Sequence, residues 1–372
     1  MTNRRSFIFS SNPWRYLAIL VGGTFALACG TAVLTLIGYT HRLVDASSLQ
    51  LFDYQMEKLD DGTAVEIAFI GDSSLGHTID ADLFGELAGR RTVNLALTAR
   101  YGYGGSYNML RHLLARHDPQ IVVILHNVAM LTEPRSPAGY HLTSPGLDLE
   151  ETSPIDLLKV YLRFDAVRGL MECVRDGCWS DPETLPIVDD YPPQGEATNR
   201  KPTTDEVRQD PLLPEDIEPD KSRFLGLIAE LCDERGIACL YAHGPIFGPY
   251  CEVSSAYIDD ANAVVRVAGL PVVKGTPACV PWSHLGDARD HVRPELKQRY
   301  TSLYYRLLMP YLGGSGGKRI GARRDAMETQ AAARCSGPLG RRHNPPDRSW
   351  ERRSRVESRP QACRPERSPD RC

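Results

Sequence analysis

The stretch Val65-Glu-Ile-Ala-Phe-Ile-Gly-Asp-Ser-Ser74 joins a short apolar run to a Gly-Asp-Ser turn. An apolar run of β-prone residues that ends at glycine predicts a buried strand followed by a turn. Two similar runs follow at residues 92–97 and 120–125, and each is preceded by a predicted helix, over residues 80–87 and 107–115. This alternation of strands and helices predicts a parallel sheet that is covered by helices on both faces.

The same pattern returns after an irregular middle part. Residues 153–175 are predicted to be helical, whereas residues 180–220 are rich in Pro, Asp, Glu and Thr and indicate a surface insertion. Beyond the insertion the predicted helices are 221–234, 254–267 and 293–312, and the predicted strands are 236–241 and 271–273. The fold class that we expect for residues 64–312 is therefore α/β, a three-layer α/β/α sandwich with a mainly parallel, flavodoxin-like sheet.

An uncharged apolar segment precedes this domain. Residues 16–39 are apolar on every helical face, and a helix that crosses a bilayer needs about 20 such residues. Because arginines at positions 4, 5 and 15 precede the segment, the positive-inside rule places residues 1–15 in the cytoplasm. We therefore expect a single-pass protein of the inner (cytoplasmic) membrane, with residues 43–63 as a connector and a periplasmic, extracytoplasmic domain. A cleaved signal peptide and a buried core helix are the alternatives.

Charge is distributed unevenly along the chain. Residues 313–372 hold 15 Lys and Arg against 7 Asp and Glu, whereas residues 1–312 hold 28 against 40. The acidic body argues against a nucleic-acid partner, because it would repel phosphate. The basic stretch lacks apolar periodicity and predicts a disordered tail, which either contacts an anionic surface or is a nonessential extension.

Cysteine spacing allows disulfides without dictating them. The chain has 10 cysteines, and an extracytoplasmic location permits their oxidation. Cys173 with Cys178, and Cys251 with Cys279, are candidate pairs. The cysteines at positions 232 and 239 lie on apparently buried faces, and their sequence context leaves open whether they are free thiols. No Cys or His cluster has the spacing of a zinc site, so no metal site is predicted.

Three residues have the chemistry of an activated serine. Ser73 follows the first predicted strand at the carboxyl edge of the sheet, where open α/β folds bind ligands. Asp287 and His291 lie just before the last predicted helix. A serine becomes a nucleophile when a histidine takes its proton, and a carboxylate then orients the imidazole. Asp287 is favoured over Asp290 because a turn of four residues folds its side chain back to the ring.

Simpler roles remain open for these residues. Ser73 alone fits a tight turn or a helix cap, and His291 fits a helix cap. His284 is a rival for the role of the base.

Acyl transfer also needs donors for a developing oxyanion. The backbone N–H of Ser73, the small-residue loop with Ala99 and Gly102, and the amide of Asn127 are the candidate donors. An ordinary loop and a strand-end turn are the alternatives for these positions.

Taken in order, Gly-Asp-Ser at Ser73, the loop at residues 99–105, Asn127, and Asp287 with His291 resemble the four sequence blocks of the SGNH (GDSL-like) hydrolases. The resemblance implies an ester-cleaving serine, an oxyanion hole and an Asp–His pair near the C-terminus of the domain. Three features depart from the family pattern. Asn127 lies between His126 and Val128 instead of in Gly-x-Asn-Asp, and four positions rather than three separate the Asp from the His. In the second block, either Gly102 or Ala99 takes the place of the family's glycine.

The resemblance also suggests what the protein does. Membrane-anchored members resemble polysaccharide acyl esterases and O-acetyltransferases, so we expect hydrolysis or transfer of ester-linked acyl groups, acetyl among them, through an acyl-Ser73 intermediate and without a cofactor. The expected substrate is an acylated carbohydrate of the cell envelope, with polysaccharide-assembly proteins as partners. A catalytically inactive scaffold and a lipid-directed esterase are the alternatives.

Overall fold

The computed structural model describes most of the predicted domain and the N-terminal apolar segment. The described residues are 13–40, 46–132, 137–147, 153–163, 167–168, 171, 175, 186–187, 191–193, 211–218 and 221–313. The predicted tail after Gly313, the N-terminal residues 1–12 and the Cys173–Cys178 pair lie outside them.

Four parallel strands form the central sheet, in the order β2-β1-β3-β4. They are β1 (Ile67–Gly71), β2 (Thr92–Ala96), β3 (Ile121–His126) and β4 (Ala238–His243). The predicted strand at residues 271–273 is reduced to one parallel bridge, from Val272 to Tyr241 beside β4. Its first residue is a proline, which has no N–H to extend the ladder. With that bridge the order matches the 2-1-3-4-5 order of flavodoxin-like sheets.

Helices precede, connect and follow these strands. They are α1 (Pro13–Thr40), α2 (Ala46–Leu59), α3 (Ser73–Thr78), α4 (Ala81–Ala88), α5 (Gly102–Leu114), α6 (Pro137–Leu142), α7 (Pro154–Tyr161), α10 (Lys221–Arg235), α11 (Gly248–Val253), α12 (Ser255–Val267) and α13 (Lys297–Leu312). A second, two-stranded sheet pairs β5 (Ile246–Phe247) with β6 (Cys279–Val280). The predicted helix over 153–175 is interrupted in the structure: α7 ends at Tyr161, and helical residues recur at the described positions 167, 168, 171 and 175.

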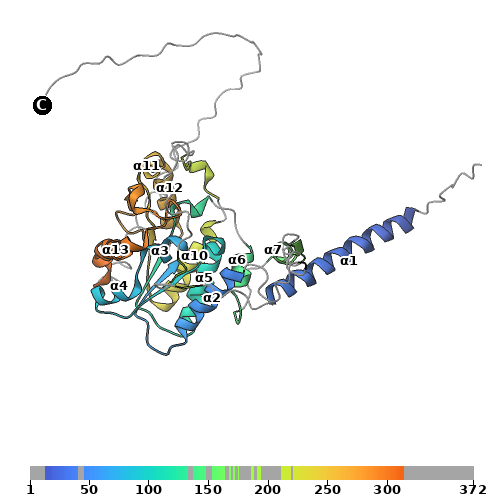
Figure 1. Ribbon diagram of the computed structural model, residues 1–372, viewed down its shortest axis with the longest axis horizontal. Coiled ribbons are helices and arrows are strands. Elements are labelled where there is room, and N and C mark those ends of the chain that lie inside the picture. Colours follow the sequence, from blue (N-terminus) through green and yellow to red (C-terminus); the bar gives the residue numbers. More distant parts are fainter. Residues whose placement is uncertain are drawn as a thin grey trace, which may run out of the picture. The chain divides into compact units, whose positions relative to one another are not determined.

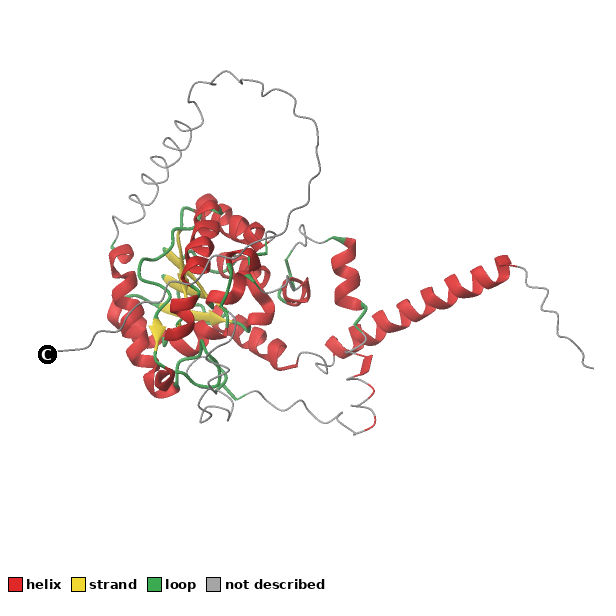
Figure 2. Cartoon of the chain, turned by 90° about the horizontal axis from the view of Figure 1, so that it is seen from above, coloured by secondary structure: helices red, strands yellow, loops and turns green. Residues whose placement is uncertain are grey.

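Helices cover both faces of the sheet, as the near-continuous apolar strands predict (Figures 1 and 2). In β1, Ala68 and Ile70 face a core that is completed by α5, α10 and α12. Ile67 and Phe69 alternate with them and face a second core, which α3, α4 and α13 complete. Because every residue of β1 is buried, the strand carries no polar face. The fold class is the α/β architecture expected from the sequence.

The N-terminal helix α1 has the dimensions of a membrane span. The most apolar 18-residue window within Trp14–Gly38 has a mean hydropathy of 2.1, and only 6% of that window is buried within the protein. A helix of 25 residues is long enough to cross the hydrocarbon core. Such exposed apolar surface is unfavourable in water and favourable in lipid.

Parts of the chain that were expected to be irregular contribute to the domain core. Within the predicted connector, α2 buries Leu51 and Phe52, and the side-chain amide of Gln55 donates to the carbonyl oxygen of Ala96 at 2.8 Å. Within the predicted insertion, Tyr191 and Leu212 are buried. The four-residue spacing of Leu51 and Gln55 places them on one helical face, which explains why α2 packs onto the sheet.

Two disulfides link elements of the domain. Cys251 is joined to Cys279, as the sequence allowed, and Cys232 is joined to Cys239, a pair that the sequence left open. The Cα atoms of the second pair are 6.1 Å apart, which is within the usual range for a disulfide. The bond connects the end of α10 to the beginning of β4 across a tight turn.

Candidate active site

The end of strand β1 holds Ser73 at the carboxyl edge of the sheet. Gly71 ends the strand, and a Cβ atom at that position would lie 1.7 Å from the carbonyl oxygen of Leu125 in β3. Only glycine therefore allows the two strands to approach so closely. Asp72 caps α3 by accepting from the N–H of Ser74, and Ser73 becomes the first residue of that helix.

Ser73, His291 and Asp287 form a continuous hydrogen-bonded chain although 218 positions separate the serine from the histidine. Ser73 Oγ lies 2.9 Å from Nε2 of His291, and Nδ1 of the same ring lies 2.8 Å from Oδ1 of Asp287. Because a carboxylate only accepts, the Nδ1–H donates to Asp287 and Nε2 accepts from the serine hydroxyl. This is the arrangement in which an imidazole can take the serine proton.

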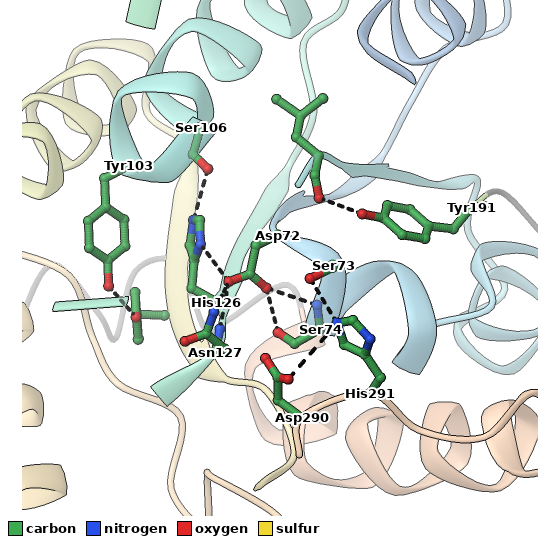
Figure 3. A network of polar contacts seen from close by, with 12 residues as sticks. Asp72, Ser73, Ser74, Tyr103, Ser106, His126, Asn127, Tyr191, Asp290 and His291 are labelled. Carbon is green, nitrogen blue, oxygen red and sulfur yellow. Dashed lines mark hydrogen bonds and ion pairs between the residues drawn. The ribbon is translucent and has the colours of Figure 1, made fainter. Parts of the chain in front are cut away.

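A second carboxylate lies on the other side of the imidazole. Oδ1 of Asp290 is 3.9 Å from Nε2 of His291 (Figure 3). Burial alone would lower the pKa of His291, but the charge of Asp290 and the hydrogen bond to Asp287 outweigh it, so the pKa rises above its usual 6.5. Burial raises the pKa of the Asp290 carboxyl. The sequence preference for Asp287 over Asp290 as the partner of Nδ1 agrees with these distances.

A buried network of hydrogen bonds around Asp72 holds the turn that carries Ser73. The Asp72 side chain is fully buried and accepts from Ser74 through its N–H at 3.0 Å and its hydroxyl at 2.6 Å. It also accepts from Asn127 through the backbone N–H at 2.9 Å and the side-chain amide at 2.7 Å. His126 contributes a longer contact, with Nδ1 at 3.4 Å. The carboxylate thus ties the end of β3 to the beginning of α3 (Figure 3).

His126 extends this network away from the pocket. Its Nε2 lies 2.8 Å from the hydroxyl of Ser106 in α5, and the ring of Tyr103 packs edge-on against it at 4.7 Å between centroids. Burial would raise the pKa of Asp72, but the contacts with His126, Ser74 and Asn127 dominate and hold it below 3.8. Asp72 therefore remains a buried anion whose oxygens accept hydrogen bonds from Ser74, Asn127 and His126.

Aromatic rings pack against the His291 imidazole. The ring of His77, from α3, lies 4.3 Å from that of His291 and 4.9 Å from that of Tyr191, measured between centroids. The Tyr191 hydroxyl donates to the carbonyl oxygen of Leu97 at 3.0 Å. Burial, together with the nearby His291, lowers the pKa of His77 to about 3, so this ring stays neutral and adds no charge beside the base.

A pocket of about 230 Å³ opens beside Ser73. Its lining is Ser73, Ala99, Asn127, Val128, Ala129, Ile246, Arg289, Asp290 and His291. Ala99 and Asn127, two of the predicted oxyanion donors, therefore share this pocket with the serine. Gly102 is not among the residues that line it; with a φ of 55° it begins α5, which explains why a glycine is required there.

The rival base predicted from the sequence lies elsewhere. Nδ1 of His284 is 2.7 Å from the hydroxyl of Tyr300, and His284 does not line the pocket beside Ser73. Over the part of the chain that the structure describes, no group of His, Cys, Asp and Glu side chains is arranged to hold a metal ion.

The residues that support Ser73 and His291 could not be identified from the sequence. Asp72 and His126 were visible only as neighbours of candidate residues, and Ser106, His77 and Tyr191 gave no signal in the sequence. The missing information was spatial: a helix and an irregular segment deliver these side chains to the ends of β1 and β3. Comparison with known protein families finds none that matches this chain, and comparison with curated protein sequences likewise finds no match.

Proposed function

We propose that this protein is an SGNH-type serine esterase or acyltransferase that forms an acyl-Ser73 intermediate. The observation that carries the proposal is the hydrogen-bonded chain from Ser73 through His291 to Asp287, with distances of 2.9 and 2.8 Å. The order of the sequence blocks, which resembles that of the SGNH hydrolases, also supports it.

The proposed reaction uses each of these groups in turn. Ser73 Oγ attacks the ester carbonyl while Nε2 of His291 takes its proton, and Asp287 stabilises the resulting imidazolium. His291 then gives the proton to the leaving alcohol, which leaves an acyl group on Ser73. Water or a second alcohol attacks this ester, and His291 serves as base and then acid again.

Donors for the oxyanion are available beside the serine. We assign this role to the N–H of Ser73, the backbone at Ala99 and the side-chain amide of Asn127. That amide already gives one hydrogen to Asp72, which fixes its orientation, and it carries a second hydrogen that an oxyanion can use. A preoriented donor stabilises the transition state because it needs no reorganisation during the reaction.

The pocket favours a small acyl group and a polar substrate. Its volume of about 230 Å³ is below the range of about 300–1,000 Å³ that is usual for drug-sized ligands. Asn127, Arg289 and Asp290 add polar groups to its wall. We therefore propose a short acyl ester, such as an acetyl ester, of a cell-envelope carbohydrate, in preference to a long-chain lipid ester.

The proposed location follows from α1 and from the charges around it. A helix that can span a bilayer, preceded by arginines, supports an inner-membrane anchor with the domain on the extracytoplasmic side. The two disulfides of the domain suit an oxidising compartment.

Labelling with a fluorophosphonate probe tests the proposal. The probe should modify the purified full-length protein at Ser73, and Ser73→Ala should abolish labelling. His291→Ala should slow labelling by roughly 10⁴-fold or more. His284→Ala is the matched control, because that histidine belongs to the same loop region and bonds Tyr300 instead. A folded wild-type protein that resists the probe would favour the inactive scaffold.

A further inference from the structure

Asp290 is a carboxylate of the pocket that the proposed reaction does not use. Its side chain is 18% exposed, lines the same pocket as Ser73 and lies 3.9 Å from Nε2 of His291. Since Asp287 occupies Nδ1 of that ring, the imidazole has a carboxylate beside each of its two nitrogens. Only one of the two is needed to orient the base.

The Asp290 carboxylate lies in the pocket wall beside His291 and accepts a hydrogen bond from its own backbone N–H. The neighbouring Arg289 guanidinium lies over the ring of Tyr250, 4.3 Å from its centroid. Asp287 and Asp72 are the other carboxylates near His291, and each is engaged by hydrogen bonds of its own. A largely buried carboxylate accepts hydrogen bonds only, so a hydroxyl-bearing molecule is its natural complement.

We propose that Asp290 and Nε2 of His291 together form a subsite for a vicinal diol on the alcohol that accepts the acyl group. This inference rests on the proposed function. Once Ser73 is acylated, its oxygen has no proton to donate, so Nε2 is free to accept from an incoming hydroxyl. Asp290, 3.9 Å away, accepts from the hydroxyl on the adjacent carbon.

The transfer step moves the acyl group from Ser73 to the diol. The first hydroxyl oxygen forms a bond to the acyl carbon while its proton moves to Nε2. The bond between that carbon and Ser73 Oγ breaks, and the proton passes from Nε2 to Oγ. The second hydroxyl stays bound to Asp290 and undergoes no reaction, so the diol leaves as its monoester.

This geometry discriminates between classes of acceptor. A vicinal diol can donate hydrogen bonds to both Nε2 of His291 and the Asp290 carboxylate, and water can do so with its two hydrogens. A simple alcohol has one hydroxyl and can donate to only one of them. An anionic acceptor meets the charge of Asp290 and is disfavoured. The subsite therefore selects neutral polyhydroxylated acceptors, for which a mono-alcohol of the same size is a poor substitute.

A partitioning experiment tests the subsite. The full-length protein is given p-nitrophenyl acetate as donor together with equal concentrations of cis-cyclohexane-1,2-diol and its monomethyl ether. The burst of p-nitrophenolate reports acylation of Ser73, and chromatography reports the two acetylated products. One hydrogen bond to a charged group should favour the diol by roughly tenfold or more.

Variants distinguish loss of the hydrogen bond to Asp290 from a general loss of folded protein. In Asp290→Ala the molecules that are still acylated should lose the preference for the diol, whatever the rate of their burst. Asp290→Asn should keep part of the preference through its carbonyl oxygen, and Asp260→Asn, on the exposed face of α12, should behave as wild type. If the wild type shows the burst but acetylates the diol and its monomethyl ether equally, the subsite is wrong and the proposed function stands. The same conclusion follows if the preference for the diol survives Asp290→Ala. Absence of a burst that depends on Ser73 would overturn the proposed function and the subsite with it.

Discussion

The residue that organises this site is Asp72, whose carboxylate is buried beside the turn that carries Ser73. Its oxygens hold Ser74 and Asn127, so one carboxylate sets both the turn that carries the nucleophile and the amide that we assign to the oxyanion. His126 comes directly before Asn127 and adds a longer contact to Asp72 from a fully buried position.

Removing His126 should weaken both stability and catalysis. His126→Ala leaves Ser106 unpaired and opens a cavity beside Asp72, so the free energy of unfolding should fall by about 3 kcal/mol or more in urea titrations. Ser106→Ala, which keeps every contact of Asp72, should cost only about 1–2 kcal/mol. Equal losses in the two variants would show that the contact between His126 and Asp72 contributes nothing.

The pH dependence should report the charges around His291. Only the neutral ring can accept the serine proton, and the pKa of His291 is raised, so kcat/KM should increase with pH through a midpoint above 6.5. Asp290→Asn removes one of the raising charges, which should move this midpoint to lower pH. An unchanged midpoint in that variant would contradict the placement of Asp290 beside Nε2.

At the scale of elements, α3 is held between the sheet and an irregular segment. The ring of Tyr191 covers Gly76, and a Cβ atom at that glycine would lie 2.2 Å from the ring. Because His77 lies between Tyr191 and His291, this contact also fixes the wall behind the base. A segment that is far from the catalytic blocks in sequence therefore contributes to the geometry of the site.

Two glycine-to-alanine substitutions distinguish a clash with the Tyr191 ring from the general effect of an alanine in a helix. Gly76→Ala forces the Tyr191 ring to move and should cost about 1–3 kcal/mol, with a lower melting temperature and reduced esterase activity. Gly226→Ala in α10 meets no atom within 4 Å and should be neutral or stabilising by about 0.5–1 kcal/mol. Similar melting temperatures for the two variants would be inconsistent with the packing described.

The sequence predicts the elements of this fold that have strong periodicity. The four strands of the central sheet and the helices α4, α5, α10, α12 and α13 lie close to their predicted ranges, because buried parallel strands and amphipathic helices leave clear patterns. The short helix α3 and the two-residue strands β5 and β6 are too short to produce a periodic signal. Helix α2 was predicted as a connector because its polar residues obscure the buried face at Leu51 and Phe52.

The same distinction applies to the candidate site. Ser73, Asp287 and His291 were predicted from the order of chemical groups along the chain, and the structure brings them into contact. Asp72, His126 and the rings behind His291 act through packing between distant segments, which sequence spacing does not encode. Prediction of Gly102 as a donor relied on its small size, whereas in the structure its positive φ explains the glycine.

At the scale of the whole molecule, the chain combines an apolar helix with an acidic folded domain. Helix α1 exposes large apolar residues along its length, among them Ile19, Leu20, Phe25 and Leu27. The body of the chain up to residue 312 carries an excess of Asp and Glu. This division suits the membrane-anchored esterase that we propose.

Charge placed in the middle of α1 should release the protein from membranes. Leu27→Arg costs about 2.5–3.5 kcal/mol at the centre of a spanning helix, so a larger fraction should appear in the carbonate-soluble supernatant than for wild type. Leu27→Ala keeps the segment uncharged and should remain in the pellet. If the arginine variant pelleted as completely as the alanine variant, α1 would not be the anchor.

The most direct test of the account is to find the acyl group on the serine. The full-length protein is mixed with p-nitrophenyl acetate, quenched with acid within the burst and digested, and the peptide that contains Ser73 is examined by mass spectrometry. We predict one acetyl group on Ser73 in the wild type and none on that peptide in Ser73→Ala. A folded protein in which no acetyl group reaches Ser73, or in which it resides on another side chain, would contradict the proposed mechanism.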